Sequence, residues 1–224
     1  MVRPQKVVVI GAGDHGRGTL EILREASRHA GGPEVVGFLD DSPLLRGALV
    51  GGLPVLGGLE WVPAEPQPDL GYVIGIADTR AKQRIAQRLS DRPVTFVSAV
   101  HPSLITASGV CIAPGAIINA GVAIAYDAVI EAHTTVNLHA TIGHDCVLGR
   151  CSTVAPGANI AGRVRLGEGC DIGVNATIGK GLEIGEWSSV GPGAVVVRSV
   201  APGQHVFGNP ARVVLPLARR SHAS

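Results

Sequence analysis

The chain contains 224 residues, of which 19 are Lys or Arg and 18 are Asp or Glu. With 46% apolar and 17% charged residues it can bury a core, which excludes a disordered protein. The near-zero net charge and the few aromatic residues disfavour nucleic-acid binding, which needs clustered cations or stacking platforms. No apolar run is long enough to span a membrane. Four cysteines without CxxC spacing favour reduced thiols, so we expect a cytoplasmic protein.

The first hundred residues alternate between strand and helix patterns. An apolar stripe at Leu20, Leu23 and Ala26 predicts a helix that stops before the Gly-Gly-Pro at 31–33. Such alternation predicts a parallel α/β sheet. We expect strands at 6–10, 35–39, 72–76 and 94–100 and helices at 17–30 and 79–89, and we assign no element to 42–69.

A GxGxxG motif at 11–16 follows the first strand and opens the first helix, so backbone N–H groups there can face an anion. Asp40 and Asp41 follow the second strand and could accept a hydrogen bond from a ribose hydroxyl. One interpretation is NAD binding, and another is a glycine turn for close strand–helix packing. Against NAD, a hundred residues hold only half a dinucleotide fold. In addition, Asp14 and His15 lie where a pyrophosphate needs bare backbone.

The helix expected at 79–89 carries four basic residues: Arg80, Lys82, Arg84 and Arg88. Their side chains could contact the diphosphate of a ligand. A solvated helix face is the simpler interpretation, and we expect it here.

From residue 112 an aliphatic residue recurs at every sixth position. A period of six is not helical, whereas short strands joined by tight turns fit it and would stack into a solenoid. The fifth place of the hexad is mostly small, as a filled interior corner requires, and Cys146 and Cys170 at this place are expected to fill the core. The recurring residues are Ile112, Ile118, Ile124, Ile130, Val136, Ile142, Leu148, Val154, Ile160, Leu166, Ile172, Ile178, Ile184, Val190 and Val196.

These hexads resemble the left-handed parallel β-helix of hexapeptide-repeat acyltransferases. The resemblance implies three hexads per coil, about five coils and a homotrimer. Residues 5–214 further resemble sugar-nucleotide acetyltransferases of the sialic acid O-acetyltransferase type, closest to the N-acetyltransferases of UDP-bacillosamine-type and GDP-perosamine-type 4-amino sugars. The matching pieces, in order, are GAGDHG (11–16), FLDD (38–41), VIGIADTR (73–80), HPS (101–103), GHDC (143–146), APGA (155–158) and GNPA (208–211).

The resemblance implies a small Rossmann-like nucleotide-sugar-binding domain at 1–103, a left-handed β-helix that binds acetyl-CoA at 104–214, and a tail at 215–224. Nucleotide-sugar contacts would come from Gly13, Asp14, His15, Asp40, Asp41 and Gly75. Acetyl-CoA contacts would come from Thr153, Gly162, Val174 and Gly191. Relatives often carry a second histidine where this chain has Thr153. We therefore expect a single histidine to accept the proton during acetyl transfer.

Acetyl transfer to an amine needs a proton acceptor, and an imidazole suits that role near neutral pH. His144 and Asp145 take the third and fourth places of their hexad, which point away from the core. The family's catalytic histidine falls on His144, with Asp145 orienting its ring or raising its basicity. Family comparison also places a supporting asparagine at Asn137, although an asparagine that tolerates a left-handed turn is an equal explanation.

Several alternatives remain open from the sequence. His133 and His139 also take outward places of their hexads. Together with His144 they resemble the zinc ligands of β-helical carbonic anhydrases, but we expect no metal. The acceptor could be a sugar hydroxyl, as in sialic acid O-acetylation. From other classes, an NAD-binding oxidoreductase and a non-catalytic trimeric scaffold are the rivals. Direct transfer from acetyl-CoA is favoured because no hexad shows a Ser or Cys nucleophile beside a base.

Overall fold

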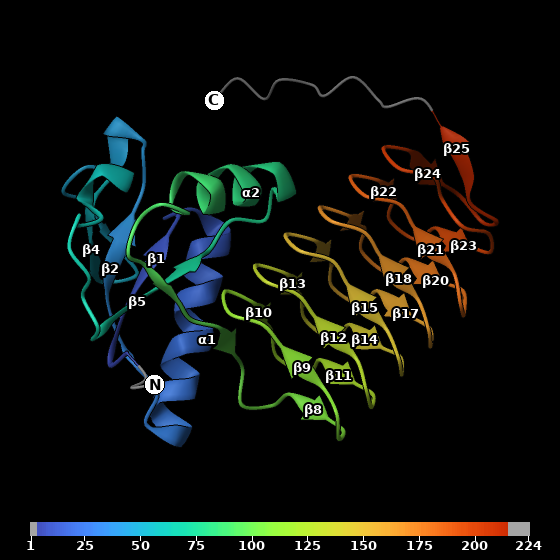
Figure 1. Cartoon of the computed structure of the whole chain (residues 1–224), viewed down its shortest axis with the longest axis horizontal. Coiled ribbons are helices and arrows are strands. Elements are labelled where there is room, and N and C mark those ends of the chain that lie inside the picture. Colours follow the sequence, from blue (N-terminus) through green and yellow to red (C-terminus); the bar gives the residue numbers. More distant parts are fainter. Residues whose placement is uncertain (1–3, 215–224) are drawn as a thin grey trace.

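A computed structural model describes residues 4–214, and the predicted tail at 215–224 lies outside them (Figure 1). The buried strand β1 (Lys6–Ile10) lies inside a six-stranded sheet of order β3-β4-β2-β1-β5-β6. Alternate side chains of β1 pack against α1 (Asp14–Ala30) on one face and α2 (Thr79–Arg88) on the other. No helix within the described range combines the length and apolarity that a membrane crossing requires.

The expected strands and helices of this α/β unit are present, with four differences, of which the first is that the strand expected at 72–76 lies two residues earlier, at Leu70–Ile74. Helix α1 begins at Asp14, inside the glycine motif. The strand expected at 94–100 is divided, because β6 pairs with β5 whereas β7 (Ala99–Val100) pairs with the solenoid strand β10. The unassigned stretch forms short elements. The remaining bounds are β2 (Glu34–Leu39), η1 (Pro43–Leu45), β3 (Leu49–Val50), β4 (Leu53–Gly57), η2 (Leu59–Trp61), β5 (Leu70–Ile74) and β6 (Thr95–Phe96).

The second part is a three-sided parallel solenoid that extends away from the α/β unit (Figure 1). Neighbouring strands of a sheet are 18 residues apart, for example Thr135 beside Thr153, which confirms three hexads per coil. The first sheet contains β7, β10 (Ile117–Ile118), β13 (Thr135–Val136), β16 (Thr153–Val154), β19 (Asp171–Ile172), β22 (Ser189–Val190), β24 (His205–Phe207) and the antiparallel β25 (Arg212–Val214). The second contains β8 (Ile105–Thr106), β11 (Ala123–Ile124), β14 (Thr141–Ile142), β17 (Asn159–Ile160), β20 (Thr177–Ile178) and β23 (Val195–Val196). The third contains β9 (Cys111–Ile112), β12 (Val129–Ile130), β15 (Val147–Leu148), β18 (Arg165–Leu166) and β21 (Glu183–Ile184).

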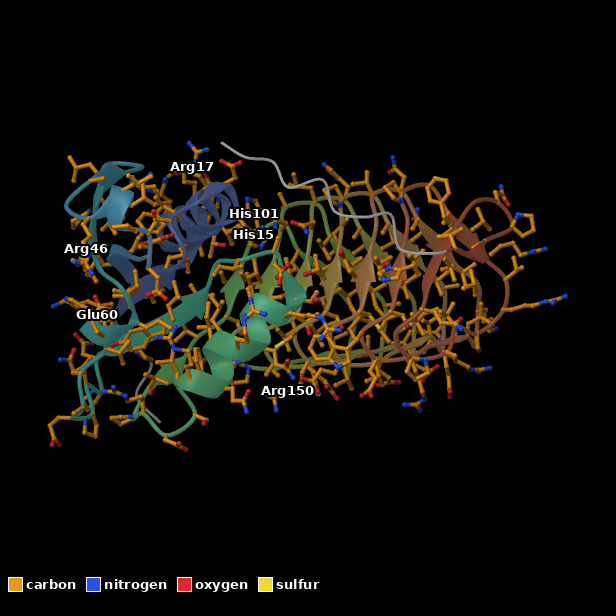
Figure 2. All side chains as sticks on the ribbon, turned by 90° about the horizontal axis from the view of Figure 1, so that it is seen from above. His15, Arg17, Arg46, Glu60, His101 and Arg150 are labelled. Atoms are coloured by element: carbon orange, nitrogen blue, oxygen red, sulfur yellow. The ribbon has the colours of Figure 1, made fainter. Side chains whose placement is uncertain are left out.

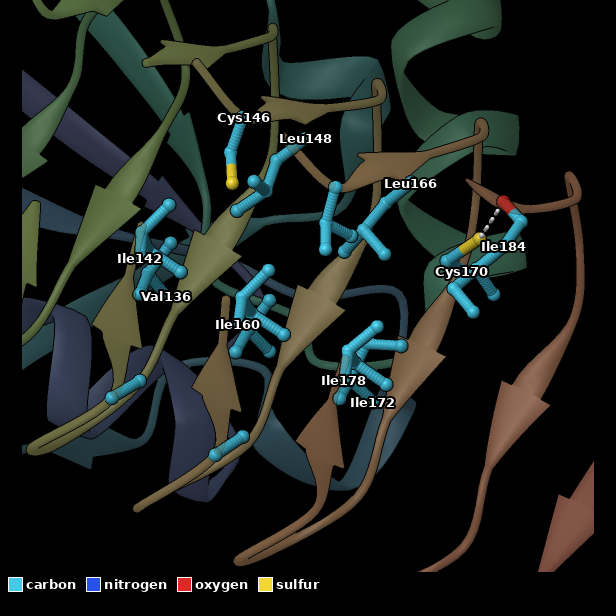
Figure 3. Packing of buried hydrophobic residues seen from close by; sticks show 14 of the residues in the cluster. Val136, Ile142, Cys146, Leu148, Ile160, Leu166, Cys170, Ile172, Ile178 and Ile184 are labelled. Carbon is cyan, nitrogen blue, oxygen red and sulfur yellow. Dashed lines mark hydrogen bonds between the residues drawn. The ribbon is translucent and has the colours of Figure 1, made fainter. Parts of the chain in front are cut away.

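The turns between sheets form three corners. The first corner joins the first and second sheets, the second joins the second and third, and the third joins the third and first. The repeating aliphatics fill the interior, as Figure 3 shows for Ile142, Ile160 and Ile178. Cys146 and Cys170 are fully buried among them, which confirms their role as core residues.

The fourth place of every hexad from 109 to 193 has a positive φ. A left-handed residue turns the chain sharply at each corner, and glycine adopts this conformation most easily. Seven of these fifteen positions are glycine. The other eight are Asp127, His133, His139, Asp145, Cys151, Arg163, Asn175 and Trp187. The left-handed conformation is therefore required at one place of the hexad, and residues with bulky side chains adopt it there as well.

Helix α2 docks on the first sheet through Lys82. Its side chain is completely buried, and Nζ donates to Ser152 O at 2.9 Å and to the hydroxyls of Thr153 at 2.8 Å and Thr135 at 3.3 Å. The expectation that Lys82 lies on a solvated face is therefore wrong. Lys82 lies on the face of α2 that packs against the solenoid. Arg80 and Arg84 of the same helix remain exposed to solvent.

Two histidines are also held in low-polarity surroundings near this junction. His133 takes an outward place of its hexad, as expected, but it is only 5% exposed because Phe96 of the α/β unit packs edge-on against it. His15 lies on the side of α1 nearest the coils (Figure 2). Burial, with smaller contributions from nearby cations, lowers the pKa of each histidine to about 4.

The turn geometry predicts opposite effects for alanine at two open glycines. Gly181 has φ +72° and Gly18 lies within α1, and an added Cβ would meet nothing at either site. Gly181→Ala should destabilise the fold by about 1 kcal/mol because of the left-handed backbone. Gly18→Ala should stabilise it by about 0.5–1 kcal/mol because a helical glycine is entropically costly. Urea unfolding of both variants provides the measurement, and equal signs would contradict the turn assignment.

The buried histidines predict acid sensitivity. The unfolded chain binds protons at these imidazoles below about pH 6.5, whereas the folded chain does so only near the lowered pKa of about 4. Stability should therefore be lost as the pH falls from 6.5 to 4, by about 1.4 kcal/mol per pH unit for each histidine. His133→Asn should roughly halve the loss in free energy of unfolding between pH 7 and pH 5, as measured by urea unfolding at each pH. The exposed His29→Asn is the control, and an equal slope in both variants would contradict the assignment.

Candidate active site

The six residues predicted to contact a nucleotide sugar all lie at the carboxyl edge of the parallel α/β sheet. Gly13, Asp14 and His15 open α1, Asp40 and Asp41 follow β2, and Gly75 follows β5. Ligands of open α/β sheets bind at this edge. A hollow of about 180 Å³ opens here, with Asp40 and Asp41 on one side and apolar groups on the others; its lining is completed by Ile10, Gly11, Leu39, Leu59, Ile76 and Ile85.

The two carboxylates of this edge hold the surrounding loops. Asp40 accepts hydrogen bonds from the amides of Ala12 and Ser42, each at 2.9 Å. Asp41 accepts one from the amide of Leu59 at 3.1 Å and pairs with Arg88 at 3.3 Å. The hollow therefore has fixed walls and carries negative charge on one side, which suits hydroxyl and N–H donors of a ligand.

The glycines of the motif divide into packing and open positions. A Cβ on Gly75 would lie 2.8 Å from Val9 Cγ1 and 2.9 Å from Gly16 Cα, and one on Gly11 would lie 2.7 Å from Ile76 Cγ1. These glycines let the first helix and two strands approach closely. Only Gly13 of the set faces open space, with Asp14 exposed beside it. Close packing therefore accounts for most of the motif, and an anion would meet the chain at Gly13.

The crevice between β1 and β5 is covered by the chain's own solenoid. Thr153 donates to Ala77 O at 2.9 Å, just beyond β5, and the buried Lys82 lies behind it. His15 Nε2 is buried there without a hydrogen-bond partner. A dinucleotide crosses a Rossmann sheet at this switch point, so the geometry disfavours the NAD-binding alternative.

His144 and Asp145 form a hydrogen-bonded pair at the second corner. His144 Nδ1 lies 2.6 Å from Asp145 Oδ2, and the ring stacks on Tyr126 with centroids 5.2 Å apart. The hydrogen bond from His144 is the main cause that lowers the pKa of Asp145, and the Arg163 guanidinium contributes in the same direction, so this carboxyl is ionised at neutral pH. A carboxylate at Nδ1 fixes the neutral tautomer with the proton on Nδ1.

The other ring nitrogen lies above Gly162. A Cβ at this glycine would be 2.5 Å from His144 Nε2, so residue 162 must lack a side chain for the ring to lie as it does. The His144 side chain is 27% exposed. Nε2 therefore carries a lone pair at the surface of the coil, oriented by Asp145 from one side and by Tyr126 from another. An imidazole nitrogen placed in this way can accept a proton from a group bound beside it.

Asn137 lies at a different corner, the first. It accepts a hydrogen bond from Asn119 at 3.2 Å and donates one to Val154 O at 3.2 Å. Its backbone is not left-handed, so the alternative explanation by turn geometry is wrong. The structure shows a ladder of side-chain amides here, and one chain does not bring Asn137 to His144.

The four positions expected to contact acetyl-CoA are dispersed in one chain. Thr153 lies beneath α2, Gly162 beneath His144, and Val174 and Gly191 at the first corner, where Val174 is 43% exposed. Next to Thr153, a cleft of about 530 Å³ opens between α2 and the first sheet. Its lining includes Asp78, Thr79, Arg80, Arg84, Asp171, Trp187, Ser189 and His205.

Sequence reasoning missed two features of this cleft. Arg80 lies over the Trp187 ring at 4.7 Å, and Ser189 hydrogen-bonds His205 Nδ1. The expectation that no hexad serine lies beside a base is therefore wrong. The last coil is two residues shorter than the others, since Ser189 pairs with His205, so the six-residue period did not reveal this contact.

The three histidines weighed as zinc ligands lie at three different corners. His133 is at the third corner, His139 at the first and His144 at the second, and they do not meet in one chain. Within residues 4–214, no three His, Cys, Asp or Glu side chains gather as metal ligands.

Known proteins resemble both parts of the chain. A family model described as the PglD N-terminal domain matches residues 6–89. The GDP-perosamine N-acetyltransferase of Escherichia coli O157:H7 is 33% identical over 157 residues, 70% of either protein. The structure of PerB from Caulobacter crescentus, in complex with CoA and GDP-perosamine, is 32% identical with a TM-score of 0.85, covering 93% of this chain and 97% of that one. The acetyltransferase domain of PglB from Neisseria gonorrhoeae, in complex with acetyl coenzyme A, is 27% identical with a TM-score of 0.85, covering 95% and 100%.

These likenesses extend over the α/β unit and the coils together. They confirm the expected fold class, a small Rossmann-like domain followed by a left-handed parallel β-helix of hexapeptide repeats. The chain belongs to the sugar-nucleotide N-acetyltransferases of the hexapeptide-repeat acyltransferase superfamily.

Proposed function

We propose that this protein transfers the acetyl group of acetyl-CoA to the amine of a nucleotide-linked 4-amino-4,6-dideoxy sugar, with His144 as the general base. The observation that carries the proposal is the His144–Asp145 pair, with Nε2 above Gly162 at the protein surface. The Escherichia coli relative named above is a GDP-perosamine N-acetyltransferase, and PerB was solved with CoA and GDP-perosamine. An amine acceptor is therefore favoured over a sugar hydroxyl.

The reaction follows from the orientation of the ring. The sugar amine attacks the thioester carbonyl carbon, and His144 Nε2 accepts the proton that the nitrogen must lose. The tetrahedral intermediate collapses with cleavage of the C–S bond, and the thiolate of CoA takes the proton from the imidazolium. Asp145 stabilises the imidazolium while it carries that proton.

The residues of this reaction lie on different sides of one chain. The nucleotide-sugar edge belongs to the α/β unit docked on the first sheet, whereas His144 lies at the second corner. A neighbouring copy must therefore complete the site, in accordance with the expected homotrimer.

One corner of the prism is suited to such self-association. The third hexad place of the first corner carries an uncharged, apolar column along the coils, whereas the same place of the second corner includes His144, Lys180 and Arg198. Leu138 and Val174 in this column are 44% and 43% exposed, so the column presents contiguous apolar surface that a second copy could cover. The column consists of Pro102, Ala120, Leu138, Pro156, Val174 and Pro192.

The function is tested by mixing the protein with acetyl-CoA, a thiol-reactive dye and a panel of UDP-, GDP- and dTDP-linked 4-amino sugars. One of these should cause thiol release. His144→Ala should lower kcat by about 10²–10⁴-fold, the usual contribution of a positioned base. Asp145→Asn should have a smaller effect because the ring remains in place.

The exposed His29→Ala is the matched control and should retain full activity. No thiol release with any amino sugar would overturn the function, and release only with sugar hydroxyl acceptors would turn it into O-acetylation. An active His144→Ala variant would remove this residue from the role of base.

The self-association is tested separately. Leu138→Glu places a charge in the apolar column and should shift sedimentation from the trimer to smaller species, with loss of activity. Leu44→Glu, at a side chain 90% exposed on the α/β unit, should leave both unchanged. A wild-type protein that sediments as a monomer while fully active would contradict the shared site.

A further inference from the structure

The buried Lys82 is the polar connection between the α/β unit and the β-helix. An ammonium group has three N–H donors. The three acceptors around Nζ, Ser152 O and the hydroxyls of Thr153 and Thr135, match that number. Thr153 passes the connection on by donating to Ala77 O at 2.9 Å. A single side chain thus ties α2, the loop after β5 and two adjacent coils to one another.

Stability alone does not explain a lysine at this position. Burial is the main cause that lowers the pKa of Lys82 to about 7, against the opposing influence of Cys151, Asp171 and Asp78. An apolar side chain of similar length would avoid that cost, although it would leave the three acceptors around Nζ without their donor. Such a residue would not fix the position of α2 on the β-helix, because apolar contacts permit sliding whereas three hydrogen bonds fix one register.

The same side chain lies beside the candidate substrate edge. Lys82 is close enough to lower the pKa of His15, one of the six nucleotide-sugar positions, and its partner Thr153 is a candidate acetyl-CoA position. If the β-helices of neighbouring copies form a fixed assembly, the docking of each α/β unit on its own helix sets the distance from its bound sugar to the neighbour's His144.

We propose that Lys82 is a positioning residue for acetyl transfer, which fixes the register of the nucleotide-sugar edge against the β-helix through its three hydrogen bonds. This inference rests on the proposed function. A displacement of about 1 Å between reacting groups can reduce a rate by about 10²-fold without weakening binding. The consequence of losing Lys82 should therefore appear in kcat.

The test compares Lys82→Met with wild type and with Gln87→Met, an exposed position on the same helix. Lys82→Met should reduce kcat by about ten- to a hundredfold, with both KM values within about threefold of wild type and a melting temperature that keeps the protein folded at the assay temperature. Gln87→Met should match wild type in all of these. Wild-type kcat in Lys82→Met would overturn the proposal. So would a loss of activity fully accounted for by a lower melting temperature, because that is what a merely structural role predicts.

A second pair of variants serves if Lys82→Met does not fold. Thr135→Val removes one acceptor at nearly constant shape and should lower kcat, whereas Thr135→Ser retains the hydroxyl and should restore it. Equal kcat in both would overturn the proposal. Failure of the proposed function can be distinguished from failure of the Lys82 proposal, because wild type would then release no thiol. In that case hydrogen exchange at residues 77–82 would still report whether Lys82→Met loosens the contact between α2 and the β-helix.

Discussion

The geometry of the molecule depends on the closure of an 18-residue coil in which every hexad makes one sharp corner. The corner requires a left-handed residue at the fourth place, and the fifth place is mostly a small buried residue. Once these two places are satisfied, the third place always points outward. His144 occupies an outward place and Asp145 the left-handed one, so the same turn that closes the coil brings the carboxylate within hydrogen-bond distance of the ring. The candidate base thus depends on the repeat and not on a specialised loop.

The α/β unit uses a nucleotide-binding scaffold in an altered way. In a dinucleotide fold, the switch point between the central strands is open to the ligand. Here Thr153 of the solenoid and Lys82 of α2 fill that region, whereas Gly13, Asp14 and the hollow beside Asp40 and Asp41 remain accessible. The glycine motif serves mainly close packing. The crevice is covered because α2 and the loop after β5 dock on the β-helix through Lys82 and Thr153.

Periodic features were predictable from the sequence, because periodicity directly reports which side chains face the core. The six-residue repeat predicted the coils, the buried cysteines and the outward pair at His144. Contacts between the two parts were not predictable, since nothing local distinguishes Lys82, which is buried, from Arg84 on the same helix, which is exposed. The same holds for Ser189 and His205, which meet only because the last coil is shorter. Strand β7 was assigned to the wrong sheet because its sequence continues an apolar run that β6 begins.

The central claim is that a nucleotide sugar bound by one copy is acetylated with the help of His144 from another. Mixing two inactive variants measures this directly. His144→Ala removes the base, and Gly13→Glu places a negative charge at an open position where the ligand's phosphates would lie. If the site is shared between copies, randomly mixed oligomers should regain about a quarter of wild-type activity, since half of the bases meet half of the intact sugar sites. If mixing restores no activity although the variants co-assemble, the shared site is contradicted.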